Sequence, residues 1–137
     1  MKAIADTGFI YAFVSSDDLH HGWAMQLADE LSGPALTCEA VLAETAYHLR
    51  SVDVVLELVE AELILPAFDL NSNLTHVQEL AMRYADRKPD LADLCLVRMS
   101  ELFPDRIVLT TDEKDFRIYR RNKRDVIPLL CPPKSRR

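Results

Sequence analysis

The chain has 137 residues, 49% of them hydrophobic and 28% charged, which favours one folded domain and excludes a disordered chain. No apolar run is long enough to span a bilayer, so we expect a soluble cytoplasmic protein without a membrane partner. The net charge of −6 conceals a segregation of signs, because residues 1–113 hold 20 acidic and 7 basic side chains whereas residues 114–137 hold 2 and 9.

Taken in chain order, short apolar segments alternate with helical patterns. Strands are expected at residues 2–5, 35–37, 63–65 and 107–110, with a possible fifth at 126–130. Helices are expected at residues 9–14, 20–31, 39–49, 52–61, 74–85 and 89–103. This alternation predicts an α/β fold in three layers, α/β/α, with a central parallel sheet of four to five strands. We expect a single domain over residues 1–131, followed by a basic C-terminal tail at residues 132–137.

Several familiar active-site motifs are absent from the sequence. The three glycines, Gly8, Gly22 and Gly33, cannot form a GxGxxG or GxxxxGK loop, which excludes dinucleotide-binding and P-loop chemistry. Neither HExxH nor GxSxG occurs, and the histidines and cysteines lack the spacing of zinc ligands. The three cysteines form no CxxC pair, so a disulfide framework is not expected and a reducing compartment is favoured.

Acidic residues at particular positions remain as candidates for a functional site. Asp6 directly follows the first expected strand and Asp112 follows the fourth, so both reach the sheet edge where the carboxyl ends of parallel strands meet. Asp90 and Asp93 are three residues apart at the start of an expected helix and therefore share one face of it. Glu44 lies inside the helix expected at 39–49, among small neighbours.

Each of these acids also has a purely structural interpretation. Asp90 with Asp93 could form a capping box, and Asp112 could cap the turn that follows it. Glu44 alone would be an ordinary surface glutamate, whereas an acid that ends an apolar strand, such as Asp6, needs donors or a metal. Carboxylates that converge repel one another unless a divalent cation binds among them, and oxygen-only ligands suit Mg²⁺ or Mn²⁺.

Four segments in this order resemble the PIN-domain family of metal-dependent nucleases: Asp6-Thr7-Gly8, Ala43-Glu44-Thr45, Asp90-Leu91-Ala92-Asp93, and Thr110-Thr111-Asp112 followed by Asp115-Phe116. The resemblance extends from Lys2 to about Leu130, which makes residues 1–131 a single PIN domain. It implies a catalytic, metal-binding set of carboxylates, namely Asp6, Glu44, Asp93 and Asp112. It gives supporting roles to Thr7, Asp90, Thr110 and Asp115. Asp93 is favoured over Asp90 as the ligand because it matches the Ala-Asp step of the family pattern.

The resemblance implies an endoribonuclease that uses Mg²⁺ or Mn²⁺ to hydrolyse RNA and leaves 5′-phosphate and 3′-hydroxyl ends. Small PIN proteins of this length are mostly VapC-like toxins of type II toxin–antitoxin pairs, so a homodimer and a cognate antitoxin are the expected partners. An acidic cleft repels RNA and therefore needs positive charge beside it. The candidates for RNA binding are the basic residues near the C-terminus, Arg117, Arg120, Arg121, Lys123 and Arg124.

Gly8 departs from the family pattern, because many members carry serine at this position. The loss of that hydroxyl keeps an alternative open, in which a PIN fold binds RNA or a protein partner with little or no cleavage. Gly8 also argues against a rival α/β class, the haloacid dehalogenase phosphatases, whose first strand ends in Asp-x-Asp.

Overall fold

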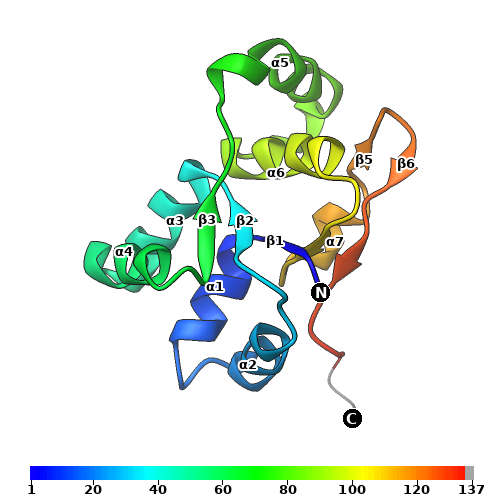
Figure 1. Ribbon diagram of the computed structural model, residues 1–137. Coiled ribbons are helices and arrows are strands. Elements are labelled where there is room, and N and C mark those ends of the chain that lie inside the picture. The colour runs from blue at the N-terminus through cyan, green and yellow to red at the C-terminus, as the bar shows by residue number, and fades with distance from the viewer. Residues whose placement is uncertain (135–137) are drawn as a thin grey trace.

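The computed structural model describes residues 1–134, and a five-stranded sheet forms its centre (Figure 1). The strands are β1 (Ala3–Ala5), β2 (Ala35–Thr37), β3 (Ile64–Pro66), β4 (Ile107–Leu109) and β7 (Leu129–Leu130). They are arranged in the order β3-β2-β1-β4-β7, and every neighbouring pair is parallel. The predicted parallel sheet is therefore confirmed.

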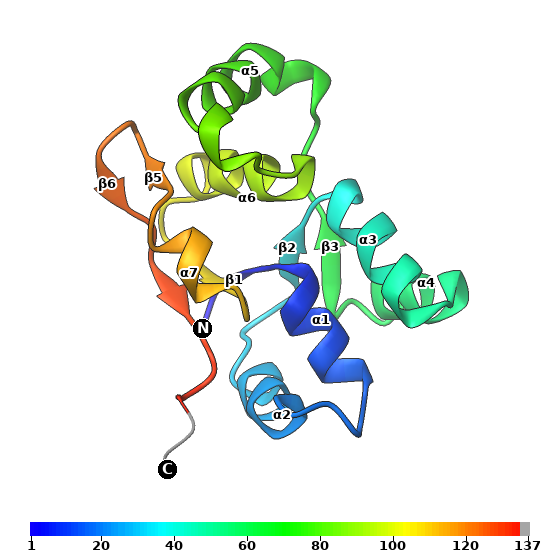
Figure 2. The same cartoon turned by 180° about the vertical axis from the view of Figure 1, so that it is seen from behind.

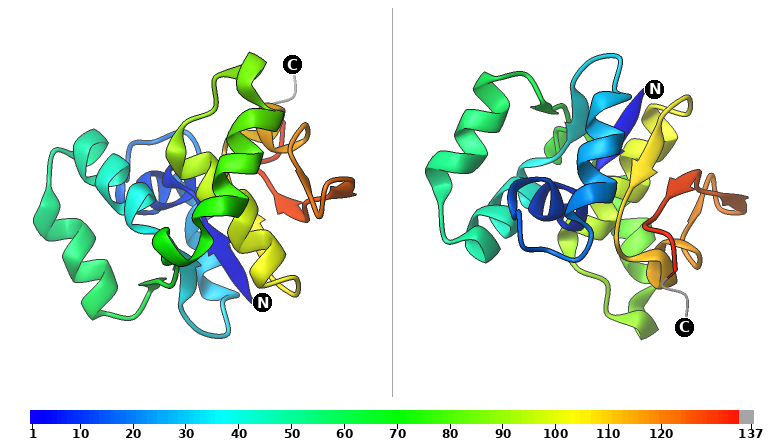
Figure 3. Two further views of the ribbon diagram at one scale, coloured as in Figure 1. Left: turned by 90° about the horizontal axis from the view of Figure 1, so that it is seen from above. Right: turned by 90° about the horizontal axis from the view of Figure 1, so that it is seen from below.

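Helices cover both faces of this sheet, as the views from above and below show (Figure 3). One layer contains α5 (Leu74–Arg83) and α6 (Leu91–Leu102). The other contains α1 (Thr7–Val14), α2 (His21–Asp29), α3 (Glu39–Leu49) and α4 (Val52–Glu60). Shorter elements are the 3₁₀ turns η1 (Asn71–Asn73) and η2 (Ala85–Arg87) and the single-turn helix α7 (Glu113–Phe116). The three-layer α/β/α architecture follows.

The central strands β1 and β4 are buried on both faces, which explains why they read as continuous apolar runs rather than as alternating patterns. Ile4 is paired with Val108, and Ala5 with Leu109. Because the two strands run in parallel and in this register, the residues that follow them emerge side by side at the same edge. This topology delivers Asp6 and the segment after Leu109 to one place.

The C-terminal region differs from the sequence prediction of a single strand at 126–130. Pro128 follows Val126 by two residues, and the structure divides the segment there. Strand β6 (Asp125–Val126) pairs antiparallel with β5 (Arg120–Arg121) in a hairpin, whereas β7 joins the main sheet beside β4. Within residues 1–134, none of the helices combines the length and apolar character that a membrane span requires.

Candidate active site

A cleft of about 400 Å³ opens at the carboxyl edge of the sheet. Figure 2 shows the elements that surround this edge: α1, α3, the start of α6 and α7. Six carboxylate side chains line the cleft, namely Asp6, Asp18, Glu44, Asp90, Asp93 and Asp112. The structure thus brings together all four acids predicted as the catalytic set, with the supporting Asp90 beside them.

Asp6 is fixed at the bottom of the cleft by two short hydrogen bonds. One carboxylate oxygen accepts from the backbone N–H of Thr7 at 2.6 Å, and the other accepts from the Thr110 hydroxyl at 2.6 Å. The same Thr110 oxygen accepts from the backbone N–H of Asp112 at 2.9 Å, so one hydroxyl connects the two acids that end β1 and β4. Burial raises the pKa of Asp6 to about 6, with Glu44 and Asp112 adding to the rise.

Capping and cleft lining are combined in the same residues. Asp6 caps α1. Asp90 caps α6, because its carboxylate accepts from the backbone N–H of Asp93 at 2.8 Å. Asp112 caps α7 in the same way and accepts from the backbone N–H of Asp115 at 3.2 Å. Each cap leaves carboxylate oxygen lone pairs free, since one N–H uses only one of them. The sequence left caps and ligands as alternatives, and the structure shows that a cap does not exclude a ligand.

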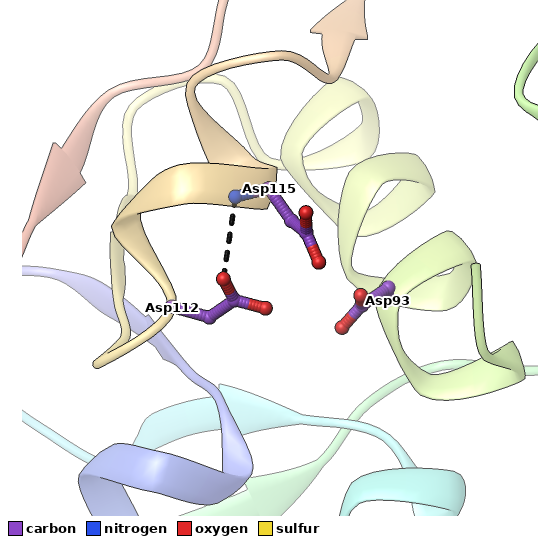
Figure 4. Close-up of side chains that lie close together, drawn as sticks. All are labelled: Asp93, Asp112 and Asp115. Atoms are coloured by element: carbon purple, nitrogen blue, oxygen red, sulfur yellow. Dashed lines mark hydrogen bonds between the residues drawn. The ribbon is translucent and has the colours of Figure 1, made fainter. Parts of the chain in front are cut away.

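The tightest group of acids is Asp93, Asp112 and Asp115 (Figure 4). One carboxylate oxygen from each lies within 4.8 Å of the others. Asp115, predicted only as a supporting acid, therefore lies beside two of the predicted metal ligands, Asp93 and Asp112. Asp6 and Glu44 line the same cleft but lie outside this closest group.

Asp93 is the most strongly perturbed acid of the cleft. It is only 8% exposed, and its carboxylate accepts a hydrogen bond from the hydroxyl of Tyr119 at 3.1 Å. Burial raises its pKa to about 8, and the negative charges of Asp90 and Asp6 contribute to that rise. Burial likewise raises the pKa of Asp112 and of Glu44 above their usual values. Burial and the mutual repulsion of the acids thus both favour the neutral form of these carboxyl groups.

This donor set fits a divalent cation of the Mg²⁺ type. The acidic side chains offer only carboxylate oxygens as donor atoms. A bound divalent cation would offset the repulsion between their negative charges. Thr7 also lines the cleft, and its buried hydroxyl has no hydrogen-bond partner within residues 1–134. Mg²⁺ keeps several of its waters when it binds to proteins, and such a water would satisfy a hydroxyl of this kind.

The space that a side chain at residue 8 would occupy is taken by the side chain of Thr111. A Cβ added at Gly8 would lie 3.0 Å from the Cβ of Thr111, and the Thr111 hydroxyl would be closer still. Both residues line the cleft. The structure therefore places the hydroxyl of Thr111 where the side chain of residue 8 would begin. Sequence reasoning missed Thr111 as a cleft residue, although a glycine at a position often held by serine was a signal that a neighbour occupies the space.

Gly8→Ser is expected to lower the free energy of unfolding by about 1–3 kcal/mol, because the new side chain overlaps Thr111 in a packed site. Adding Thr111→Ala to Gly8→Ser should recover a large part of that loss. Thermal or urea unfolding measures both effects. Gly33→Ser is the matched control, since among residues 1–134 only Gly33 and its two chain neighbours can lie within 4 Å of a Cβ built there. Equal losses at Gly8 and Gly33 would contradict this account of the clash.

The predicted RNA-binding run does not gather beside the acids. The guanidinium of Arg121 donates to the backbone carbonyls of Ser100 and Pro104 at 3.1 and 3.2 Å, at the end of α6 opposite Asp93. Ser100 lies about 10 Å further along the helix axis than Asp93. The guanidinium of Arg121 is therefore held at the C-terminal end of α6, away from the acids of the cleft, where it binds a carbonyl of the last turn.

The rest of the run is divided between different surroundings. Arg120 donates to the backbone carbonyl of Arg117 at 2.6 Å, and Lys123 lines a separate cavity between α5 and α6 with Asn122. Arg124 is exposed in the β5–β6 hairpin. Arg117 is the C-cap residue of α7, and its guanidinium pairs with Glu113 of that helix at 3.9 Å.

Positive charge beside the acids comes instead from the segment before α6. The guanidinium of Arg87 lies 3.6 Å from the carboxylate of Asp115, and Lys88 follows it in an exposed left-handed conformation with φ 50°. Two histidines, His20 and His48, line the cleft as well. The sequence carried a signal for the first pair, since Arg87 and Lys88 directly precede Pro89 and Asp90.

Comparison with known protein families supplies the remaining evidence. The model of the family described as "PIN domain" matches residues 3–122, which is most of the chain. A search of curated proteins gave no match. PIN domains are generally nucleases that act on nucleic acid with the help of divalent metals, and the carboxylate cluster of this cleft agrees with that chemistry. The chain is therefore a member of the PIN-domain family and has the fold of a nuclease.

Proposed function

We propose that the protein is an endoribonuclease that depends on Mg²⁺ or Mn²⁺. The observation that carries this proposal is the convergence of Asp6, Glu44, Asp93 and Asp112 in one cleft, with Asp115 beside Asp93 and Asp112. These side chains would hold the cation, with Thr7 and Thr110 in supporting positions. When bound, a divalent cation lowers the pKa of coordinated water and neutralises charge that develops on the phosphoryl oxygens.

The chain's own residues have distinct tasks in such a site. Thr110 holds Asp6 and the backbone of Asp112 in a fixed relation, so the acids need no reorganisation before reaction. Tyr119 orients Asp93 through its hydroxyl. Asp112 is the candidate to orient the attacking water or to hold a second ion. Its hydrogen bond to the first turn of α7 fixes the carboxylate just beyond the C-terminal end of β4.

RNA contact at the rim of the cleft is proposed for Arg87, Lys88 and Arg117. Arg87→Gln should weaken binding of single-stranded RNA and reduce the slope of log affinity against log salt by about 0.7, because one phosphate contact is lost. Arg121→Gln should leave that slope unchanged and instead lower the free energy of unfolding by about 1–2 kcal/mol. A salt titration of binding distinguishes the two, and an unchanged slope for Arg87→Gln with a reduced slope for Arg121→Gln would contradict this assignment.

The biological role that we propose is that of a type II toxin, silenced by a cognate antitoxin and active as a homodimer. The support is the sequence resemblance to VapC-like PIN proteins and the length of the chain. Growth arrest on expression of the wild type, but not of Asp112→Asn, is the expected result. Growth unaffected by wild-type protein that cleaves RNA in vitro would contradict the toxin role and leave the nuclease role intact.

The nuclease proposal is tested by incubating single-stranded RNA with the wild type and with Asp112→Asn in Mn²⁺ or in EDTA. Asparagine is as good an N-cap as aspartate, so the variant should keep α7 and lose only the charge. We expect cleavage by the wild type in Mn²⁺ alone, with 5′-phosphate ends. Binding of RNA without cleavage would instead support the alternative of an RNA-binding PIN module.

A further inference from the structure

A second cavity, of about 690 Å³, adjoins the acidic cleft. We call it the Trp23 cavity, and the residues that matter for its character are His20, Trp23, Thr111, Pro132, Pro133 and Lys134. His20 and Thr111 line the acidic cleft as well, so the two hollows are neighbours that share these two side chains. The first residues of the expected C-terminal tail thus form one wall of this cavity, while residues 135–137 of that tail lie outside the described part of the chain.

Two aromatic rings pack against Trp23. Its ring packs edge-to-face against the fully buried ring of Phe9, with centroids 5.9 Å apart and planes at 84°. His20 contacts it in a second T-shaped arrangement at 6.4 Å. The indole remains partly exposed and lines the cavity. A rigid, partly exposed aromatic ring next to two prolines is a stacking surface.

We propose that the Trp23 cavity binds the nucleobase of the nucleotide next to the phosphodiester that occupies the acidic cleft, an inference that rests on the proposed nuclease function. Stacking on aromatic side chains is a principal source of affinity for single-stranded RNA and tolerates any base. The exposed ammonium of Lys134 provides a positive charge for a neighbouring phosphate. Glu113 also lines the cavity, and its carboxylate is paired with Arg117 at 3.9 Å and can accept from a base amino group.

The fluorescence of Trp23, the single tryptophan of the chain, reports on this site directly. Asp112→Asn protein is titrated in Mn²⁺ with an RNA trinucleotide, and with trinucleotides that lack one base at each position in turn. We expect saturable quenching by the intact RNA. Removal of the base at one position should weaken binding by about 5- to 150-fold, with smaller effects at the others.

A substitution at Gly22 blocks the cavity without disturbing the core. Gly22 lines the cavity on α2, and apart from its chain neighbours and the backbone of its own helix, no atom of residues 1–134 lies within 4 Å of a Cβ built there. Gly22→Leu should therefore fill the hollow and abolish the dependence on that base. Gln26→Leu is the matched control, since this exposed residue lies one turn further along α2, outside the cavity lining.

The outcomes separate this inference from the proposed function. Wild-type cleavage in Mn²⁺ that is equally fast with and without each base, together with unchanged Trp23 fluorescence, would overturn the base site and keep the nuclease. That result would instead favour a peptide partner as the occupant of the Trp23 cavity. Quenching that depends on one base and is lost in Gly22→Leu supports the base site, even if wild-type protein cleaves no RNA and the nuclease proposal fails.

Discussion

Replacing Asp93 by asparagine is expected to abolish RNA cleavage and, at the same time, to stabilise the metal-free protein at pH 8. The amide oxygen of the new side chain would still accept the hydrogen bond from Tyr119, so the change removes a charge and little else. The removed charge is one that burial and the neighbouring acids Asp90 and Asp6 disfavour. Loss of function with a gain of stability is the signature of a residue retained for its chemistry.

The pH dependence of this gain follows from the direction of the pKa shift. The pKa of Asp93 rises from 3.8 in the unfolded chain to about 8 in the fold, so the folded protein binds a proton that the unfolded chain releases. The fold carries no penalty from this group below about pH 4, and the penalty grows as the pH rises towards 8. Asp93→Asn should therefore gain on the order of a few kcal/mol at pH 8 and almost nothing at pH 4.

Urea unfolding in EDTA at several pH values measures the effect. Asp105→Asn is the matched control, because Asp105 is exposed in the loop before β4 and lies outside the cleft. A variant that is less stable than wild type at pH 8, or equally changed at pH 4 and pH 8, would contradict the account of a strained buried carboxylate.

Millimolar Mn²⁺ is expected to raise the midpoint of thermal unfolding of the wild-type protein by several degrees at pH 8. A ligand at 100 times its dissociation constant stabilises the fold by about 2.7 kcal/mol, and about 1 kcal/mol shifts the midpoint of a domain this size by several degrees. The cation must displace protons from Asp6 and Asp93, whose pKa values are about 6 and about 8. The shift should therefore be smaller at pH 6 than at pH 8.

Asp93→Asn should lose most of this Mn²⁺ response, whereas Asp105→Asn should keep it. Differential scanning calorimetry at both pH values, with an EDTA reference, provides the comparison. A midpoint that is indifferent to Mn²⁺ at pH 8 in the wild type would contradict the metal site. A response that is equal at the two pH values would contradict the displacement of protons.

The sequence predicted the fold and the acids of the cleft because both depend on local patterns and on sheet topology. Asp6 directly follows an apolar strand, and Asp112 comes three residues after the end of another, and parallel pairing alone brings such residues to one edge. The spacing of Asp90 and Asp93 at the start of a helix was enough to predict that they share one face of it. The assignment of metal ligands and catalytic roles among these acids remains a prediction.

What the sequence could not predict depends on contacts between distant segments. The place of Thr111 in the space beside Gly8 joins residues about a hundred positions apart. Arg121 reads as part of a basic run, yet its side chain completes a helix end that composition does not reveal. The division of residues 126–130 between two sheets is decided by two-residue pairings, which are too short to leave a periodic signal.

The most direct test of the central claim is the rate of RNA cleavage measured across a titration of free Mn²⁺ at pH 8. If the carboxylates of the cleft hold the catalytic cation, the rate should rise from zero in EDTA and saturate at the Mn²⁺ concentration that also saturates the thermal shift. The Asp93→Asn variant should stay inactive at every concentration. Cleavage that persists in EDTA, or that saturates independently of the thermal shift, would contradict the assignment of this cleft as a metal-dependent nuclease site.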